Sequence, residues 1–203
     1  MGVSRQFRSA PYDSRRRREV MCISRLVKQK NLTSLLHAWA SVHERDKSAL
    51  LRIVGEGPER QYLIYLAQSL GIENSVRFEG RVSDVRKWEL LDQAMLFVHP
   101  SLQEGFGIVL LEAMLAGLPI VAYDLPVFRQ FVSHGLHGLF APLADHERLA
   151  ECILALLNDE ELRTEISRAN TEYVGEFEWE QAADREEEIL RAIVSGRRAS
   201  VER

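Results

Sequence analysis

Short apolar runs alternate with amphipathic segments through most of the chain. Five short runs predict strands; they cover residues 19–24, 49–54, 76–79, 95–99 and 119–123. Taken together they are too continuously apolar to leave one face of a sheet in water, which is typical of a parallel sheet. Between them, apolar residues recur at helical spacing. The first predicted helix begins after the candidate N-cap Asn31, and the next three cover residues 59–70, 84–93 and 107–116. Gly71 is expected to end the second helix in the left-handed conformation.

This alternation of strand and helix predicts an α/β fold, a Rossmann-like parallel sheet with helices on both faces. After residues 138–140 the pattern becomes purely helical, with segments at residues 145–158, 160–174 and 180–194. Residues 1–18 are polar and rich in arginine, and residues 195–203 show no periodicity. We therefore expect one domain, residues 19–194, between a linker and a tail.

Composition and charge narrow the class of protein. Hydrophobic residues make up 46% of the 203 residues and charged residues 28%, which is enough apolar material for one substantial core. The formal net charge of −4 argues against a nucleic-acid partner, because a surface that follows phosphates usually shows a basic excess. We interpret the arginine run at residues 15–18 as a solvated linker; the alternative is a weak, peripheral contact with anionic membrane lipid.

The cysteines and the longest apolar stretch indicate the cellular compartment in which the protein is expected. Cys22 and Cys152 lie far apart among apolar neighbours and form no CxxC pair, which is typical of buried thiols in a reducing compartment. The sequence does not begin with the apolar segment of a signal peptide, and Glu112, Gly117 and Pro119 interrupt the longest apolar stretch. We expect a cytoplasmic protein with no membrane-spanning helix.

Charged residues and glycines follow four of the predicted strands at the points where the strands end. In an open parallel sheet these loops share the carboxyl edge, where ligands bind, and right-handed crossovers bring them onto one rim. The candidates are Arg25 and Lys30 after the first strand, Gly55 and Gly57 after the second, Arg81 and Val82 after the third, and Glu104, Gly105 and Gly107 after the fourth.

The fourth of these loops has the chemistry of a phosphate site. A helix that opens at Gly107 offers unpaired N–H groups and the positive end of its dipole to an anion. Arg25 and Lys30 add two cations from a neighbouring loop, which would match a diphosphate better than a single phosphate. Taken alone, either cation could be ordinary surface charge.

Glu112 lies in a helix that is otherwise apolar. Its neighbours on the helical wheel are Ile108, Val109, Leu115 and Ala116, so it belongs to no polar stripe. Because a buried carboxylate without partners costs several kcal/mol, we expect Glu112 to face the ligand and accept hydrogen bonds from sugar-like hydroxyls. An exposed helix position is the alternative.

Glu104 lies in the loop before this helix and would point into the same space. The acid and base of a hydrolase must flank the bond they cleave, with their carboxyl groups about 5–10 Å apart. A carboxylate in the flank of a buried helix is poorly placed for that, so we do not interpret Glu104 and Glu112 as such a pair.

The segment from Glu104 to Glu112, followed by AMLAGLPIVA, resembles the E-x7-E motif of the retaining, nucleotide-sugar-dependent group-1 glycosyltransferases, which have the two-domain GT-B fold. Further motifs of that family follow the same order: SRLVKQKN resembles GRLxxxKG, LLRIVGEGP resembles LxIVGxGP, VRFEGRV resembles VxFxGxV, FVHPSLQEGFG resembles FxxPSxxEGFG, HGLF resembles NGLL, and FEWEQAA resembles FSWExxA. Each motif is weak alone, but their order and spacing across residues 2–183 make coincidence improbable.

The resemblance implies the donor-binding C-terminal domain of a glycosyltransferase, with residues 1–18 as the interdomain linker. A separate N-terminal domain would bind the acceptor, a glycan or a lipid. Arg25 and Lys30 would hold the donor diphosphate and act in catalysis with Glu104, which would bind the donor sugar, while Glu112 would bind the ribose. The implied donor-binding set is Gly55, Gly57, Arg81, Val82, Glu104, Gly105, Phe106, Gly107, Ile108, Val109 and Glu112. No D-x-D triplet occurs in the chain, so the resemblance implies transfer without a metal ion or another cofactor.

Two segments depart from the family pattern. Asn31 stands where the family has a glycine, and residues 124–132, DLPVFRQFV, stand where it has DxGGxPEIV, so Pro126 and Val127 replace a glycine pair and Gln130 a glutamate. The second departure leaves open a non-catalytic nucleotide-sugar-binding or assembly module. A sugar-nucleotide epimerase of related architecture fits less well, and the nucleobase, the sugar and the acceptor stay open.

Three histidines complete the candidates. His99 ends the fourth strand, where we expect a structural hydrogen bond. His134 and His137 have a spacing that suggests a metal, but no third ligand is near, so we expect solvated loop residues. Gly55 and Gly57 lack the third glycine of G-x-G-x-x-G, and we expect no NAD site.

Overall fold

A computed structural model describes residues 17–174 of the chain. Within them, six strands form one sheet in the order β3-β2-β1-β4-β5-β6, and every neighbouring pair is parallel. The strands are β1 (Glu19–Ile23), β2 (Leu50–Val54), β3 (Val76–Gly80), β4 (Leu96–His99), β5 (Ile120–Tyr123) and β6 (Gly138–Ala141). The sheet grows outward in both directions from β1 and β4, so the structure confirms the predicted doubly wound fold.

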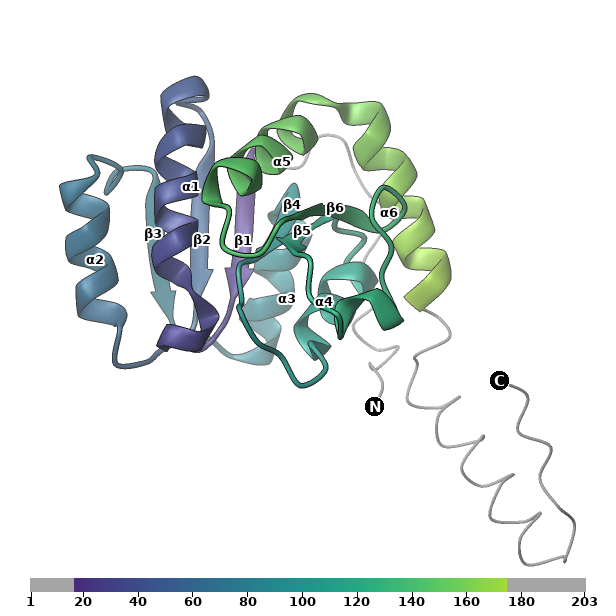
Figure 1. The fold of residues 1–203 in the computed structure, drawn as a ribbon, viewed down its shortest axis with the longest axis horizontal. Coiled ribbons are helices and arrows are strands. Elements are labelled where there is room, and N and C mark those ends of the chain that lie inside the picture. The colour runs from purple at the N-terminus through teal and green to yellow at the C-terminus, as the bar shows by residue number, and fades with distance from the viewer. Residues whose placement is uncertain (1–16, 175–203) are drawn as a thin grey trace, which may run out of the picture.

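Helices cover both faces of this sheet (Figure 1). One face carries α1 (Leu32–Arg45), α2 (Arg60–Ser69) and α5 (His146–Asn158), and the other carries α3 (Asp84–Gln93) and α4 (Ile108–Leu115). The last described helix, α6 (Glu160–Val174), packs against α4 and α5. No helix within residues 17–174 is both long enough and apolar enough to cross a membrane.

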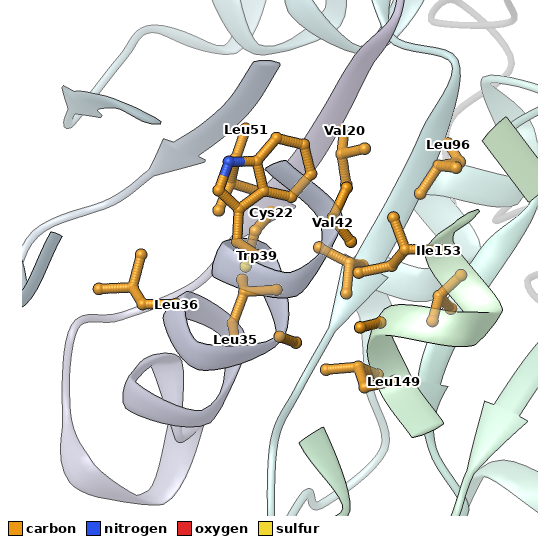
Figure 2. Packing of buried hydrophobic residues seen from close by; sticks show 14 of the residues in the cluster. Val20, Cys22, Leu35, Leu36, Trp39, Val42, Leu51, Leu96, Leu149 and Ile153 are labelled. Atoms are coloured by element: carbon orange, nitrogen blue, oxygen red, sulfur yellow. The ribbon is translucent and has the colours of Figure 1, made fainter. Parts of the chain in front are cut away.

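Strand side chains alternate between two apolar cores. Val20 and Cys22 of β1 belong to the core under α1, α2 and α5, whereas Met21 between them belongs to the core under α3 and α4. Figure 2 shows the ring of Trp39, from α1, next to Leu51 and Val20 of the sheet. The apolar residues that recur at helical spacing in α1 are all buried: Leu32, Leu35, Leu36, Trp39 and Val42. The continuously apolar strands are therefore explained by burial on both faces.

The structure adds one strand to the predicted elements and confirms the predicted end of α2. Strand β6 was not predicted; it has four residues, begins with a glycine, and only Gly138 and Ala141 are buried. Gly71 does end α2 in the left-handed region, with φ 69°. The helix predicted at 180–194 and the tail at 195–203 lie outside the described residues, as does most of the predicted linker.

Asn31 occupies the residue before α1, but its side chain makes no capping hydrogen bond, which corrects the predicted N-cap. Its backbone is left-handed, with φ 51° and ψ 39°, and closes the 3-10 turn η2 (Lys28–Lys30) through a bond from its N–H to the Lys28 carbonyl. Glycine adopts this conformation freely and asparagine tolerates it. The asparagine in place of the family's glycine therefore keeps the loop geometry.

Arg18 was expected in solvent with the arginine run, but it is bound to the folded body. Its guanidinium forms an ion pair with Asp46 and donates to the Leu157 carbonyl at 2.9 Å. Arg18 therefore ties the start of β1 to the ends of α1 and α5.

Candidate functional site

Four loops follow the carboxyl ends of β1 to β4 and form the rim: the β1 loop (residues 24–31), the β2 loop (55–59), the β3 loop (81–83) and the β4 loop (100–107). Backbone hydrogen bonds join three of them. The Leu26 N–H donates to the Glu56 carbonyl at 2.9 Å, and the Leu102 N–H donates to the Gln29 carbonyl at 3.0 Å. The β1 loop, which carries Arg25 and Lys30, is thus held between the β2 and β4 loops.

Lys30 and Glu104, both predicted site residues, lie together at the centre of the rim. The Lys30 ammonium forms an ion pair with Oε1 of Glu104, and their side chains are only 16% and 11% exposed. The His99 Nε2 lies 2.6 Å from the same oxygen, which confirms the structural hydrogen bond expected for this histidine. Burial raises the pKa of Glu104, but the hydrogen bonds from His99 and Lys30 outweigh it and lower this pKa to about 2. Glu104 is therefore a fixed negative charge.

Glu112 lies one turn into α4, where its Oε1 is 2.7 Å from the Nζ of Lys87 on α3. The two side chains are 21% and 17% exposed, so the pair is partly buried at the junction of the two helices. Lys87 also lies 3.4 Å from Asp84 and faces the Trp88 ring at 5.7 Å. The sequence analysis missed Lys87, because a helical wheel compares residues of one helix and Lys87 lies on a different helix from Glu112. The carboxylate in an apolar helix is explained by a cation from the neighbouring helix.

The N-terminus of α4 has no side-chain cap, and its first turn holds no acidic residue. Its N-cap, Gly107, has φ 89°, and a Cβ there would lie 2.8 Å from the Phe128 ring, so no other residue fits. A Cβ on Gly105 would meet nothing within 4 Å. Ile108 is 39% exposed and Phe106 and Val109 are half-buried. The N–H groups of this turn therefore have no side-chain cap, which is the arrangement that binds anions at a helix N-terminus.

Gly55 and Gly57 face the protein rather than open space. A Cβ on Gly55 would lie 1.9 Å from the Ser24 carbonyl oxygen, and one on Gly57 would lie 2.3 Å from that of Leu26. Contact between the β1 and β2 loops thus explains both glycines without a ligand. Their predicted contact with a donor stays a prediction.

The other predicted residues of the rim take no part in the two ion pairs. Arg25 and Arg81 are exposed, and neither guanidinium forms a hydrogen bond or an ion pair with another residue of 17–174. Val82 is half-buried against the core under α3 and α4. A cavity of about 580 Å³ opens beside the rim between the β1 loop and α2, and Lys28, Asn31 and Tyr62 help to line it.

The segment that departs from the family pattern is folded against the rim. Phe128 is buried, and its ring meets that of His99 edge-on at 5.8 Å between centroids. Arg129 holds Asp124 with two hydrogen bonds, of 2.7 and 2.5 Å. Gln130, in place of the family's glutamate, is exposed. The segment thus packs behind Glu104 through Phe128 while Gln130 faces solvent.

His137 corrects a prediction, since it is buried at 5% exposure rather than solvated. Its Nδ1 accepts from the Ser133 N–H at 3.0 Å and its ring stacks on Tyr173, while burial lowers its pKa. The Nδ1 of His134 accepts from the Phe140 N–H at 3.0 Å. The described residues hold no group of three or more His, Cys, Asp or Glu side chains that could bind a metal ion.

Fold and rim together define a Rossmann-like α/β protein with charged residues gathered at the carboxyl edge of its sheet. The model of the family "Glycosyl transferases group 1" matches residues 5–173. The chain belongs to this family.

Curated relatives include a phosphatidyl-myo-inositol mannosyltransferase of Mycobacterium leprae, 36% identical over 156 residues. Another is a GDP-mannose-dependent alpha-(1-6)-phosphatidylinositol monomannoside mannosyltransferase of Mycobacterium tuberculosis, 32% identical over 180 residues. The alignments cover 76% and 85% of this chain but 41% and 47% of the relatives. The chain therefore spans less than half of the length of either protein.

Among solved structures, Anabaena Alr3699/HepE in complex with UDP superposes with a TM-score of 0.84 at 24% identity, over 94% of this chain and 56% of that one. The lipopolysaccharide glycosyltransferase WaaG superposes with a TM-score of 0.72 at 28% identity, over 84% of this chain and 47% of that one. The likeness to Alr3699/HepE shows the fold alone.

Proposed function

We propose that this chain is the donor-binding domain of a retaining glycosyltransferase. It binds a nucleotide-diphosphate sugar at the rim, and a separate N-terminal domain, in the same or another chain, holds the glycan or lipid acceptor. The observation that carries the proposal is the position of Lys30, which reaches a buried carboxylate beside the uncapped N-terminus of α4. In this assignment residues 1–18 link the two domains and residues 19–194 form the donor domain.

The charges of the rim match the parts of such a donor. Lys30 and Arg25 neutralise the diphosphate, together with the N–H groups at the start of α4. Glu104 accepts hydrogen bonds from hydroxyls of the sugar, and Glu112 from those of the ribose. The β3 loop, with Arg81 and Val82, borders the nucleobase. Two of the similar proteins support a nucleotide sugar as the ligand, since one relative is named GDP-mannose-dependent and the Alr3699/HepE structure contains UDP.

Negative charge develops on the leaving nucleoside diphosphate as the bond to the sugar breaks. Cations already fixed in place stabilise such charge without reorganising at that moment, and loss of one costs roughly 3 kcal/mol. Lys30 supplies this charge from the β1 loop, so we propose transfer without a metal ion. Two relatives are named for phosphatidylinositol substrates, which supports a lipid acceptor and a peripheral membrane contact on the cytoplasmic side.

Calorimetric titration of the full chain with UDP, GDP and ADP sugars tests the proposal. We expect one nucleotide to bind, and Lys30→Ala and Glu112→Ala each to weaken it at least about tenfold. Lys28→Ala is the matched control, because Lys28 is an exposed lysine in the same loop. If no nucleotide binds even at millimolar concentration, the proposal is wrong.

A second candidate is a non-catalytic module that binds a nucleotide sugar or assembles a partner. It is favoured by the exposed Gln130 in place of the family's glutamate. Mixing the chain with its N-terminal half, expressed separately, and measuring sugar transfer distinguishes the two: transfer eliminates the non-catalytic module.

A further inference from the structure

His99 is a buried histidine that no proposed donor contact uses. It is the last residue of β4, 1% exposed, and its Nε2 lies 2.6 Å from Oε1 of Glu104. Its ring stacks on Phe97 at 6.3 Å and meets Phe128 edge-on at 5.8 Å. Its other nitrogen, Nδ1, is buried with no hydrogen-bond partner among the described residues. Aromatic packing therefore fixes the ring, and its one hydrogen bond goes to Glu104.

The chemistry of the contact fixes the tautomer of His99. An ionised carboxylate only accepts hydrogen bonds, so the Nε2 must carry the proton. His99 therefore donates from Nε2 to the Glu104 carboxylate.

Both donors to Glu104 bind the same oxygen. The Lys30 ammonium and the His99 ring reach Oε1, and Oε2 receives no hydrogen bond from residues 17–174. One oxygen of Glu104 thus fixes the side chain, and the other is available to a ligand hydroxyl.

We propose that His99 is a positioning residue that holds Glu104 for the donor sugar. This inference rests on the proposed function. When a donor binds, Lys30 turns its ammonium toward the diphosphate, because a lysine has a flexible stem and a dianionic group attracts it more strongly than one carboxylate. His99 cannot follow, since its ring is packed between two phenylalanines. It keeps Oε1 in place, and Oε2 accepts the sugar hydroxyl.

Because Glu104 contacts the sugar and not the nucleotide, the affinity ratio of a nucleotide sugar to its nucleoside diphosphate reports on His99. His99→Leu keeps the volume but removes the donor, and we expect it to weaken nucleotide-sugar binding about tenfold while nucleoside-diphosphate binding changes less than about twofold. His99→Gln places an amide N–H near the position of Nε2 and should restore most of the loss. His43→Leu is the matched control, because His43 lies at the far end of α1 and its Nδ1 likewise has no partner among the described residues.

Calorimetry on the full chain separates the outcomes. Equal weakening of both ligands by His99→Leu would overturn the inference, as would a His99→Gln variant no better than His99→Leu. If the wild type binds neither ligand, the proposed function itself fails. The nitrogen-15 spectrum of the His99 ring in the ligand-free chain is an independent readout, which remains decisive if His99→Leu does not fold. It should show the proton on Nε2, and a proton on Nδ1 alone would contradict the inference.

Discussion

Glu104 and Glu112 are the two ends of one sequence motif, yet the structure places them in different surroundings. Glu104 lies in a loop and shares one oxygen between a lysine and a buried histidine. Glu112 lies on a helix and meets a single lysine from the neighbouring helix. The motif therefore combines a rigid carboxylate, held by a histidine at the end of β4, with a carboxylate held only by the long side chain of a lysine on the neighbouring helix.

Substitution of the two glutamates should show that they contribute differently to sugar transfer. The loss of kcat in Glu104→Gln is the largest effect we expect. Under the proposed function, Glu104→Gln should lower kcat about 100-fold, because its carboxylate would contact the sugar as the bond breaks. Glu112→Gln should mainly raise the donor KM, since its proposed contact with the remote ribose would be equal in the ground and transition states. Steady-state kinetics with the acceptor domain present measures both. Equal losses of kcat in the two variants would show that Glu104 and Glu112 do not differ in their roles.

The second-largest effect should be that acid removes the contribution of Glu104 to the free energy of unfolding. The folded-state pKa of Glu104 is about 2, below its ordinary value of 4.5. A lowered carboxyl pKa stabilises the fold above about pH 4.5, and this contribution, at most about 3 kcal/mol, is lost as the pH falls toward 2. Urea unfolding of the wild type and Glu104→Gln at about pH 7 and about pH 3 should show the gap between them narrowing in acid. A gap independent of pH would mean that Glu104 does not titrate in this way.

The smallest effect should come from the lysine on Glu112. Lys87→Met should reduce the free energy of unfolding by about 0.5–1 kcal/mol, because both side chains of the Lys87–Glu112 pair are partly exposed and the second partner of Lys87, Asp84, lies in solvent. Lys30→Met should cost more, about 2 kcal/mol, since it leaves the more deeply buried carboxylate with His99 alone. Chemical unfolding of the two variants side by side measures the difference. If Lys87→Met were less stable than Lys30→Met, Lys87 would contribute more to the stability of the fold than Lys30, contrary to our expectation.

Much of the fold could be predicted from the sequence, because continuous apolar strands and helical periodicity are local signals. Strands β1 to β5 and the apolar face of α1 were predicted in this way. Strand β6 carries a weaker signal, since its four residues include a glycine and only two of them are buried. Asn31 was placed correctly but for the wrong reason, because an N-cap and a left-handed residue favour the same amino acid.

For the site, strand ends and glycines indicated which loops meet, and Lys30 and Glu104 do lie together. The partners His99 and Lys87 depend on side-chain directions across separate elements, which one sequence does not reveal. The sequence also does not reveal why Gly55 and Gly57 are glycines. In the structure, close contact between the β1 and β2 loops explains both of them without a ligand.

A crystal structure of the full chain with its nucleotide sugar would show directly where the diphosphate binds. Our expectation is that the diphosphate lies between Lys30 and the N-terminus of α4, with Glu104 still bound to His99 and a sugar hydroxyl on Oε2. A diphosphate in the cavity beside Lys28 and Tyr62, with the ion pair of Lys30 and Glu104 unchanged, would contradict it.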